Sequence, residues 1–217
     1  RAFGLPVHDW LAVAENVDAV LNECARDGVL LRDLGYDGPI LPPQPASGGI
    51  DFDSLPPLSA FARPSERRLI LVKGYHGWAG RALHALSAVR LAAAHLRDYR
   101  IRILRPAPVV SEMAALIAES GGLDIAPASW VPDHAAAVRR MGEARMMLAC
   151  GISDGIGTTL LEAMSVGAWP IVSDTCCAAE WFEPGRDGHL GSPHDVAGMA
   201  EAIRRAATDD ALVDAAA

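Results

Sequence analysis

Short apolar runs alternate with longer stretches of helical periodicity from residue 69 to the end of this 217-residue chain. A continuous apolar run is typical of a strand buried on both faces, and apolar residues at helical spacing indicate a helix with one buried side. The expected strands cover 69–73, 101–104, 124–126, 146–150 and 170–173, and the expected helices cover 80–97, 111–119, 135–142, 159–167 and 196–207. Ser111 and Asp195 are the expected N-caps of two of these helices. This alternation predicts an α/β fold, a doubly wound parallel sheet with helices on both faces.

The first 67 residues lack this alternation. The elements expected there are a helix over 24–34, a short strand over 39–41, and either a strand or a helix end over 17–21. Residues 42–67 are rich in Pro, Gly and Ser, which is typical of a linker or an irregular crossing segment. We therefore divide the chain into the tail of an N-terminal domain (1–51), a linker (52–67) and a main domain (68–217).

A glycine-containing turn, Asp154-Gly155-Ile156-Gly157-Thr158, stands between an expected strand and the next expected helix. A strand, such a turn and a helix N-terminus form an anion site, because backbone N–H groups point at the ligand and the helix dipole favours negative charge. Asp154 and Glu162 stand eight positions apart across this turn. Carboxylates repel phosphate, so we expect these two to accept hydrogen bonds from hydroxyl groups. Phosphate and hydroxyls together indicate a nucleotide sugar.

Each part of this motif also has a purely structural interpretation. Glu162 stands three residues after Thr159, the spacing of a capping box. Asp154-Gly155 is an ordinary turn dipeptide. The motif alone therefore leaves a ligand site and a structural turn both open.

Composition and charge narrow the possible classes. A hydrophobic content of 51% and a charged content of 21% argue against disorder. The net charge of −8 argues against general nucleic-acid binding, which needs a basic surface. No apolar run reaches the roughly 18 residues of a membrane span, so we expect at most peripheral membrane contact. No secretory signal is visible and nothing requires an oxidising compartment, so we expect a cytoplasmic protein, either free or at the inner face of the membrane.

The start of the chain and the absence of other motifs add further expectations. The chain opens at Arg1, which fits either a processed or truncated piece or an unobserved start. The histidines and cysteines show no metal spacing, so no metal site is expected. A Gly-x-Ser-x-Gly elbow, a Walker pattern and a Gly-x-Gly-x-x-Gly turn are absent from the sequence. Their absence weighs against a serine hydrolase, a nucleoside triphosphatase and a dinucleotide oxidoreductase.

Several motifs in order carry a resemblance to a known family. They are Asp154-Gly155-Ile156-Gly157, Leu161-Glu162-Ala163-Met164, Gly167-Ala168-Trp169-Pro170-Ile171-Val172-Ser173-Asp174, Glu180, and Gly185-Arg186-Asp187-Gly188-His189-Leu190-Gly191. On these motifs, residues 68–207 resemble the C-terminal, donor-binding domain of retaining GT-B glycosyltransferases of the group 1, or family 4, type. Gly49-Ile50-Asp51 is similar to the segment that closes the family's N-terminal domain. The resemblance implies a Rossmann-like donor domain, with most of the N-terminal acceptor-side domain missing from this chain.

The resemblance also implies roles for individual residues. Glu162 is expected to accept hydrogen bonds from the nucleotide ribose, and Asp154 to contact hydroxyls of the donor sugar. The residues whose backbone is expected to approach the sugar and diphosphate are Gly155, Ile156, Gly157 and Thr158. Lys73, the only lysine among 19 Lys and Arg residues, and Arg81 are the expected basic pair that stabilises the departing diphosphate. The resemblance implies no metal or other cofactor.

Some positions depart from the family pattern or leave a choice open. Asp154 stands where the family has glutamate, so its contact with the sugar is expected to shift or to pass through water. Arg81 also fits a solvated surface residue. Cys176-Cys177 replaces a glycine pair and is expected to fill a tight turn. Trp78 and Trp130 follow expected strands, and each fits either a wall of the donor site or internal packing.

The sequence thus predicts the donor-binding part of a retaining, metal-independent glycosyltransferase. Such an enzyme moves a hexose from a nucleoside diphosphate sugar to a hydroxyl of a glycan or lipid acceptor. The expected partners are this donor and an acceptor bound through the missing N-terminal domain, and the chain alone is expected to transfer poorly. The alternatives are a non-catalytic nucleotide-sugar-binding module of the same fold and a sugar-nucleotide epimerase.

Overall fold

The computed structural model describes residues 12–13, 16–44, 49–155, 157–175 and 177–217. Its contacts divide the chain into two compact units, Arg1–Gly49 and Ile50–Ala217. Within the described residues, no helix combines the length and the apolar character needed to cross a membrane.

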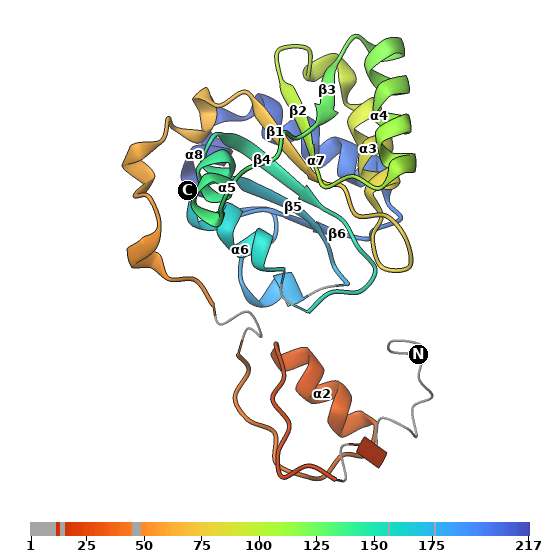
Figure 1. Cartoon of the computed structure of the whole chain (residues 1–217), viewed down its shortest axis with the longest axis vertical. Helices are drawn as coiled ribbons and strands as arrows, with labels where there is room; N and C mark the ends of the chain where they lie inside the picture. Colours follow the sequence, from red (N-terminus) through yellow and green to blue (C-terminus); the bar gives the residue numbers. More distant parts are fainter. Residues whose placement is uncertain (1–11, 14–15, 45–48, 156, 176) are drawn as a thin grey trace. The chain divides into compact units, whose positions relative to one another are not determined.

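Helix α2 and one pair of bridged residues lie in the described part of the first unit. Helix α2 covers Ala25–Asp33, as its sequence predicts, and Gly35 after it has a φ of 93° (Figure 1). A φ of this sign favours glycine and ends the helix. Val20 and Ile40 form an isolated parallel bridge on either side of the helix. These described residues thus form a rudimentary strand–helix–strand arrangement. The sequence left a strand or a helix end open for 17–21, and the structure shows extended backbone at Val20.

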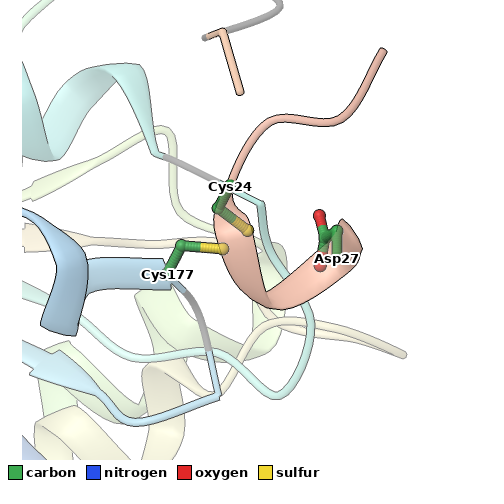
Figure 2. A group of neighbouring side chains, drawn as sticks. All are labelled: Cys24, Asp27 and Cys177. Atoms are coloured by element: carbon green, nitrogen blue, oxygen red, sulfur yellow. The ribbon is translucent and has the colours of Figure 1, made fainter. Parts of the chain in front are cut away.

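Cys24 and Cys177 each lie at the beginning of a short helical segment. Figure 2 shows Cys24 and Asp27 on the first turn of α2 and Cys177 on the segment η5 (Cys177–Glu180). In the first unit, the Asp27 N–H donates to the Cys24 carbonyl at 3.2 Å. In the second unit, the Cys177 N–H donates to the Gly155 carbonyl at 3.3 Å. Cys176 lies outside the described residues, so the prediction that Cys176 and Cys177 together fill a tight turn stays a prediction.

The second unit is built on a six-stranded sheet in which every paired strand is parallel to its neighbour. The strands are β1 (Leu69–Lys73), β2 (Arg100–Leu104), β3 (Asp124–Pro127), β4 (Ala144–Ala149), β5 (Trp169–Ser173) and β6 (His189–Gly191). Their order across the sheet is β3-β2-β1-β4-β5-β6. This order starts at the centre and runs outward in both directions, which is the doubly wound arrangement that the sequence predicts.

Helices cover both faces of the sheet (Figure 1). They are α3 (Ala82–Leu91), α4 (Pro108–Gly121), α5 (His134–Gly142), α6 (Thr158–Ser165), α7 (Val196–Thr208) and α8 (Asp210–Ala215). Helices α3, α4 and α7 pack on one face, in a core that includes Ile70, Val72 and Met146. Helices α5 and α6 pack on the other, in a core that includes Leu71 and Met147. Burial on both faces explains why the central strands are continuous apolar runs.

An irregularity in the central strand pair decides which side chains enter which core. Leu69 on β1 lies opposite Ala144 on β4, but the next residue, Ile70, lies opposite Met146. Arg145 is therefore an extra residue in β4, a β-bulge. Because of this extra residue, Ala144 and Met146 point into opposite cores although they stand two positions apart.

The bulged Arg145 side chain is fully buried and ties three segments together. Its guanidinium donates to the Ala206 carbonyl at 2.6 Å, to the Ser65 carbonyl at 2.7 Å and to the Asp210 carboxylate at 2.7 Å. These acceptors lie on α7, on the short turn η3 (Pro64–Glu66) and on α8. The segment that precedes β1 is thereby fixed against the amino-terminal edge of the sheet.

Of the two N-caps that the sequence predicts, the structure confirms one and corrects the other. Asp195 caps α7 as predicted, since its side chain accepts from the Gly198 N–H at 2.8 Å. Ser111 is wrong as a cap, because α4 begins three residues earlier at Pro108 and Ser111 lies inside it. Proline suits the first helical position, since its fixed φ is helical and its missing N–H has no partner to lose there.

We expect Arg145→Met to lower the free energy of unfolding by about 2–4 kcal/mol, because two buried carbonyls lose their donor and Asp210 loses its partner. Urea denaturation followed by circular dichroism measures this loss. The matched control is Arg204→Met on α7, whose exposed ion pair with Glu201 predicts a much smaller loss. Equal effects of the two substitutions would contradict the role given to Arg145.

Stability is also expected to fall in mild acid. Burial lowers the pKa of His189, and burial together with the nearby His194 and Arg81 lowers the pKa of His84. The ordinary pKa of histidine is about 6.5, so below that pH these histidines bind protons more readily in the unfolded chain than in the folded one. The free energy of unfolding is therefore highest above this pKa and decreases as the pH falls. We expect a lower melting temperature at pH 5.5 than at pH 7.5, and a smaller decrease in His189→Gln. An unchanged decrease in that variant would contradict the assignment to His189.

Candidate functional site

The point where the strand order reverses lies between β1 and β4. Their carboxyl ends open a crevice, which is where ligands bind in open α/β sheets. The loops that follow these strands meet there: the Arg81 N–H donates to the Cys150 carbonyl at 3.1 Å, and the Ile152 N–H donates to the Ala79 carbonyl at 2.7 Å. The chain therefore builds one continuous rim from two segments about seventy residues apart in sequence.

Two glycines allow the loop after β1 to fold this tightly. A Cβ on Gly80 would overlap the Tyr75 carbonyl group, and a Cβ on Gly74 would lie 2.6 Å from the Pro106 Cα. Both contacts involve backbone, which cannot move aside as a flexible side chain can. Only glycine therefore permits the approach at either position.

Lys73 and Asp154 meet across the crevice. Lys73 is the last residue of β1, and its ammonium lies 3.1 Å from the Asp154 carboxylate in the turn after β4. The two side chains are 36% and 42% exposed, so the pair contributes less than about 1 kcal/mol to stability. Two of the residues predicted to act on the donor are thus brought together in a position open to a ligand.

Glu162 lies on α6 and forms a short contact with a residue that sequence reasoning missed. Its carboxylate lies 2.6 Å from Nε2 of His134, the first residue of α5. The Glu162 side chain is 11% exposed and that of His134 is 65% exposed. The capping-box interpretation of Glu162 is wrong, because α6 begins at Thr158 with Gly157 as its N-cap, which places Thr159 inside the helix.

A cavity of about 650 Å³ lies against this carboxylate. Its wall includes basic, acidic, aromatic and apolar side chains: Leu71, Lys73, Tyr75, Leu104, Arg105, Pro106, Ala128, Ser129, Trp130, Val131, Ala137, Arg140, Met141, Thr159 and Glu162. Three cations, Lys73, Arg105 and Arg140, face one carboxylate in a protein whose net charge is −8. This local excess of positive charge favours an anionic ligand.

The two arginines of the wall are positioned in different ways. Arg140 donates to the Ser129 hydroxyl at 2.9 Å, which holds its guanidinium beside the loop after β3. Arg105 directly follows β2 and has a φ of 45°, in the left-handed region that side chains other than glycine rarely adopt. Trp130 is 83% exposed and lines the cavity, so of its two interpretations the structure favours a wall over internal packing.

Arg81 lies at the rim but is not part of the cavity wall among the residues that the structure describes. Its guanidinium donates to the Gly77 carbonyl at 2.9 Å and to the Gly80 carbonyl at 2.7 Å. It is the N-cap residue of α3, one position before the helix begins. In this structure Arg81 therefore closes the loop after β1.

The predicted diphosphate cradle is the N-terminus of α6. Gly157 is its N-cap and Thr158 its first residue, and no side chain caps it. Its first backbone N–H groups consequently lack the side-chain acceptor that most helix N-termini have. Gly155 accepts from the Cys177 N–H through its carbonyl, and Ile156 lies outside the described residues. The geometry suits an anion at this helix end.

Comparison with known proteins agrees with this arrangement. Residues 129–216 match the family model described as glycosyl transferases group 1. Among solved structures, TarM of S. aureus, determined with UDP, α-GlcNAc-glycerol and fondaparinux, has a TM-score of 0.77 at 13% identity, over 96% of this chain and 41% of TarM. The pneumococcal O-GlcNAc transferase GtfA, determined with UDP and GlcNAc, has a TM-score of 0.75 at 20% identity, over 96% of this chain and 42% of GtfA.

The sucrose-phosphate synthase of Thermosynechococcus elongatus has a TM-score of 0.74 at 18% identity, over 97% of this chain and 54% of the synthase. No curated protein sequence matches the chain. This chain thus spans about half or less of the length of these three proteins. These matches confirm the resemblance to GT-B glycosyltransferases and the Rossmann-like fold.

The positive φ of Arg105 implies backbone strain at the carboxyl end of β2, and substitutions at this residue test it. We expect Arg105→Gly to raise the free energy of unfolding by about 0.5–1 kcal/mol, because glycine adopts a positive φ without steric cost. Arg105→Ala is the matched control, since it removes the same guanidinium but keeps the Cβ that causes the strain. Urea unfolding compares the two variants, and equal midpoints would contradict the strain.

Proposed function

We propose that the second unit binds a nucleoside diphosphate sugar as the donor domain of a glycosyltransferase. The observation that carries the proposal is the placement of Asp154 and Glu162 on either side of the α6 N-terminus, each in contact with a side chain from a distant segment. This arrangement lies at the switch point between β1 and β4, where a ligand of this fold is expected.

The cavity offers a chemically matched partner for each part of such a donor. Lys73 and the uncapped N–H groups of α6 suit the diphosphate, which carries negative charge. Glu162 suits the ribose hydroxyls, because an ionised carboxylate only accepts hydrogen bonds. UDP is the first nucleotide to test, since the TarM and GtfA structures were determined with it.

In the proposed transfer, a hydroxyl oxygen of the acceptor forms a bond to the anomeric carbon of the sugar while the bond from that carbon to the diphosphate breaks, and the proton of this hydroxyl passes to the departing diphosphate. Negative charge develops on the departing oxygen. Lys73 and the backbone of Gly155 to Thr158 would stabilise this charge without reorganising. Arg81 would take part by exchanging its carbonyl partners, Gly77 and Gly80, for phosphate oxygens.

The resemblance to GT-B glycosyltransferases also suggests the donor sugar, the stereochemistry and the acceptor of the proposed reaction. The donor sugar is a hexose, its anomeric configuration is retained, and neither a metal nor another cofactor takes part. Asp154 contacts hydroxyls of this hexose. The acceptor is a hydroxyl of a glycan or lipid, bound in the intact enzyme at the cytoplasmic side of the cell with at most peripheral membrane contact. The isolated chain is expected to bind the donor and to transfer sugar poorly.

Calorimetry with UDP, GDP and their sugars tests the proposal. We expect Glu162→Gln to weaken nucleotide binding about 10- to 100-fold, because hydrogen bonds to a charged acceptor contribute about 1.5–3 kcal/mol. We expect Lys73→Ala to weaken binding of the diphosphate more than binding of the nucleoside, since the lost charge faces the phosphates. The matched controls are Glu201→Gln and Arg204→Ala on α7, which should leave the affinity unchanged.

The outcomes separate the candidate functions. Absence of nucleotide binding, or binding unaffected by both site substitutions, would contradict a donor domain. Binding with no transfer by a longer form of the protein would favour the non-catalytic module. An epimerised free nucleotide sugar would favour the epimerase.

A further inference from the structure

The contact between His134 and Glu162 joins the amino end of α5 to the middle of α6, and both helices pack on the same face of the sheet. His134 is the first residue of α5, and Asp133 before it caps the helix by accepting from the Ala136 N–H at 2.7 Å. Thr159 and Glu162 stand one turn apart on α6 and both line the cavity. The position of the imidazole is therefore set by a capped helix end.

The Glu162 carboxylate is engaged on one side only. Its Oε1 atom lies 2.6 Å from His134 Nε2, and this is the one side-chain contact of its carboxylate within the part of the chain that the structure describes. Glu162 lies in the cavity wall, whereas His134 does not. The histidine thus approaches the carboxylate from outside the cavity.

Hydrogen-bonding capacity determines the direction of this contact. An ionised carboxylate has no hydrogen to give, so with Glu162 ionised the Nε2–H of His134 donates to Oε1. Glutamate has three rotatable side-chain bonds, and a donor at one oxygen restricts the plane of the carboxylate. The second oxygen, Oε2, then keeps its capacity to accept.

We propose that His134 is a positioning residue, which holds Glu162 so that Oε2 accepts hydrogen bonds from the ribose hydroxyls of the bound nucleotide. This inference rests on the proposed function of the site. His134 itself lies outside the cavity and touches no part of the nucleotide. Its effect on affinity should therefore pass through Glu162 and depend on the ribose hydroxyls.

A comparison of ligands isolates this effect. Calorimetry or intrinsic fluorescence gives the dissociation constants of UDP and of 2′,3′-dideoxy-UDP, which lacks both hydroxyls, with GDP and its dideoxy form measured in parallel. We expect His134→Ala to weaken binding of the nucleotide with hydroxyls about tenfold, and to change binding of the dideoxy form less than about twofold. A loss of folding or of general packing would weaken both ligands equally.

Two further variants sharpen the comparison. His134→Gln carries an amide N–H that reaches about as far as Nε2 and should recover most of the affinity, because it can donate to Oε1. His95→Gln is the matched control on the exposed turn η4 (Ala93–His95) and should change neither ligand. Melting temperatures of the variants verify that they fold.

The outcomes distinguish the inference from the function on which it rests. If the unsubstituted protein prefers the nucleotide with hydroxyls and His134→Ala keeps that preference, the positioning role is overturned while the donor site stands. Tighter nucleotide binding by His134→Ala would also overturn it, since it would mean that the imidazole competes with ribose for the carboxylate. Absence of nucleotide binding by the unsubstituted protein would overturn both.

Discussion

The pairing of β1 with β4 at the centre of the sheet is the constraint on which the rest of the second unit depends. From this pair the chain winds outward in both directions, so the carboxyl ends of β1 and β4 form the switch point where a ligand of this fold is expected. The bulge at Arg145 sets the register of the pair and directs Ala144 and Met146 into opposite cores. The same residue fixes the amino-terminal edge through buried hydrogen bonds, which leaves the opposite edge to carry the ligand site.

Charged side chains therefore have different roles at the amino-terminal and carboxyl ends of the strands. At the amino-terminal edge, Arg145 is fully buried and its donors are satisfied mainly by backbone carbonyls, so it serves stability. At the carboxyl edge, Lys73 and Asp154 are about one-third to two-fifths exposed and contribute little to stability. Groups that add little to folding are free to exchange their partner for a ligand. The carboxyl edge also contains Arg105, whose positive φ is a cost to folding.

Much of this arrangement could be predicted from the sequence because the strands are buried on both faces and hence appear as unbroken apolar runs. The resemblance assigned Lys73, Asp154 and Glu162 to the donor site; the structure pairs Lys73 with Asp154, and Lys73 and Glu162 line the same cavity. The bulge could not be predicted, since Arg145 resembles a polar interruption of a strand until its partners are known. The three-residue strand β6 is too short for periodicity to detect. Helix α8 did leave a signal, because Asp209 caps it before a short apolar run.

The contacts within the site were harder to predict than its location. His134 stands 28 positions before Glu162, and a single histidine at a helix start has no pattern that points to a carboxylate. The left-handed backbone conformation of Arg105 could not be predicted either, because the residue there is not glycine, asparagine or aspartate, the types that adopt it most readily. The role of Arg81 as the closure of its own loop depends on carbonyls that only the folded loop orients. Sequence thus indicated Lys73 and Glu162 of the cavity wall, whereas Arg105 and Arg140 and the pairing among the site residues became evident only in the folded structure.

The most direct test of the account is to locate a bound nucleotide by NMR during a titration of the isotope-labelled chain with UDP. A nucleotide bound between β1 and β4 should shift the backbone signals of residues 74–81 and 150–158 and the indole signal of Trp130, which is exposed at the cavity. The indole signal of Trp169, which is buried within β5, should stay in place. Shifts confined to the amino-terminal edge around Ser65 and Arg145, with the carboxyl edge unchanged, would contradict a nucleotide site between β1 and β4.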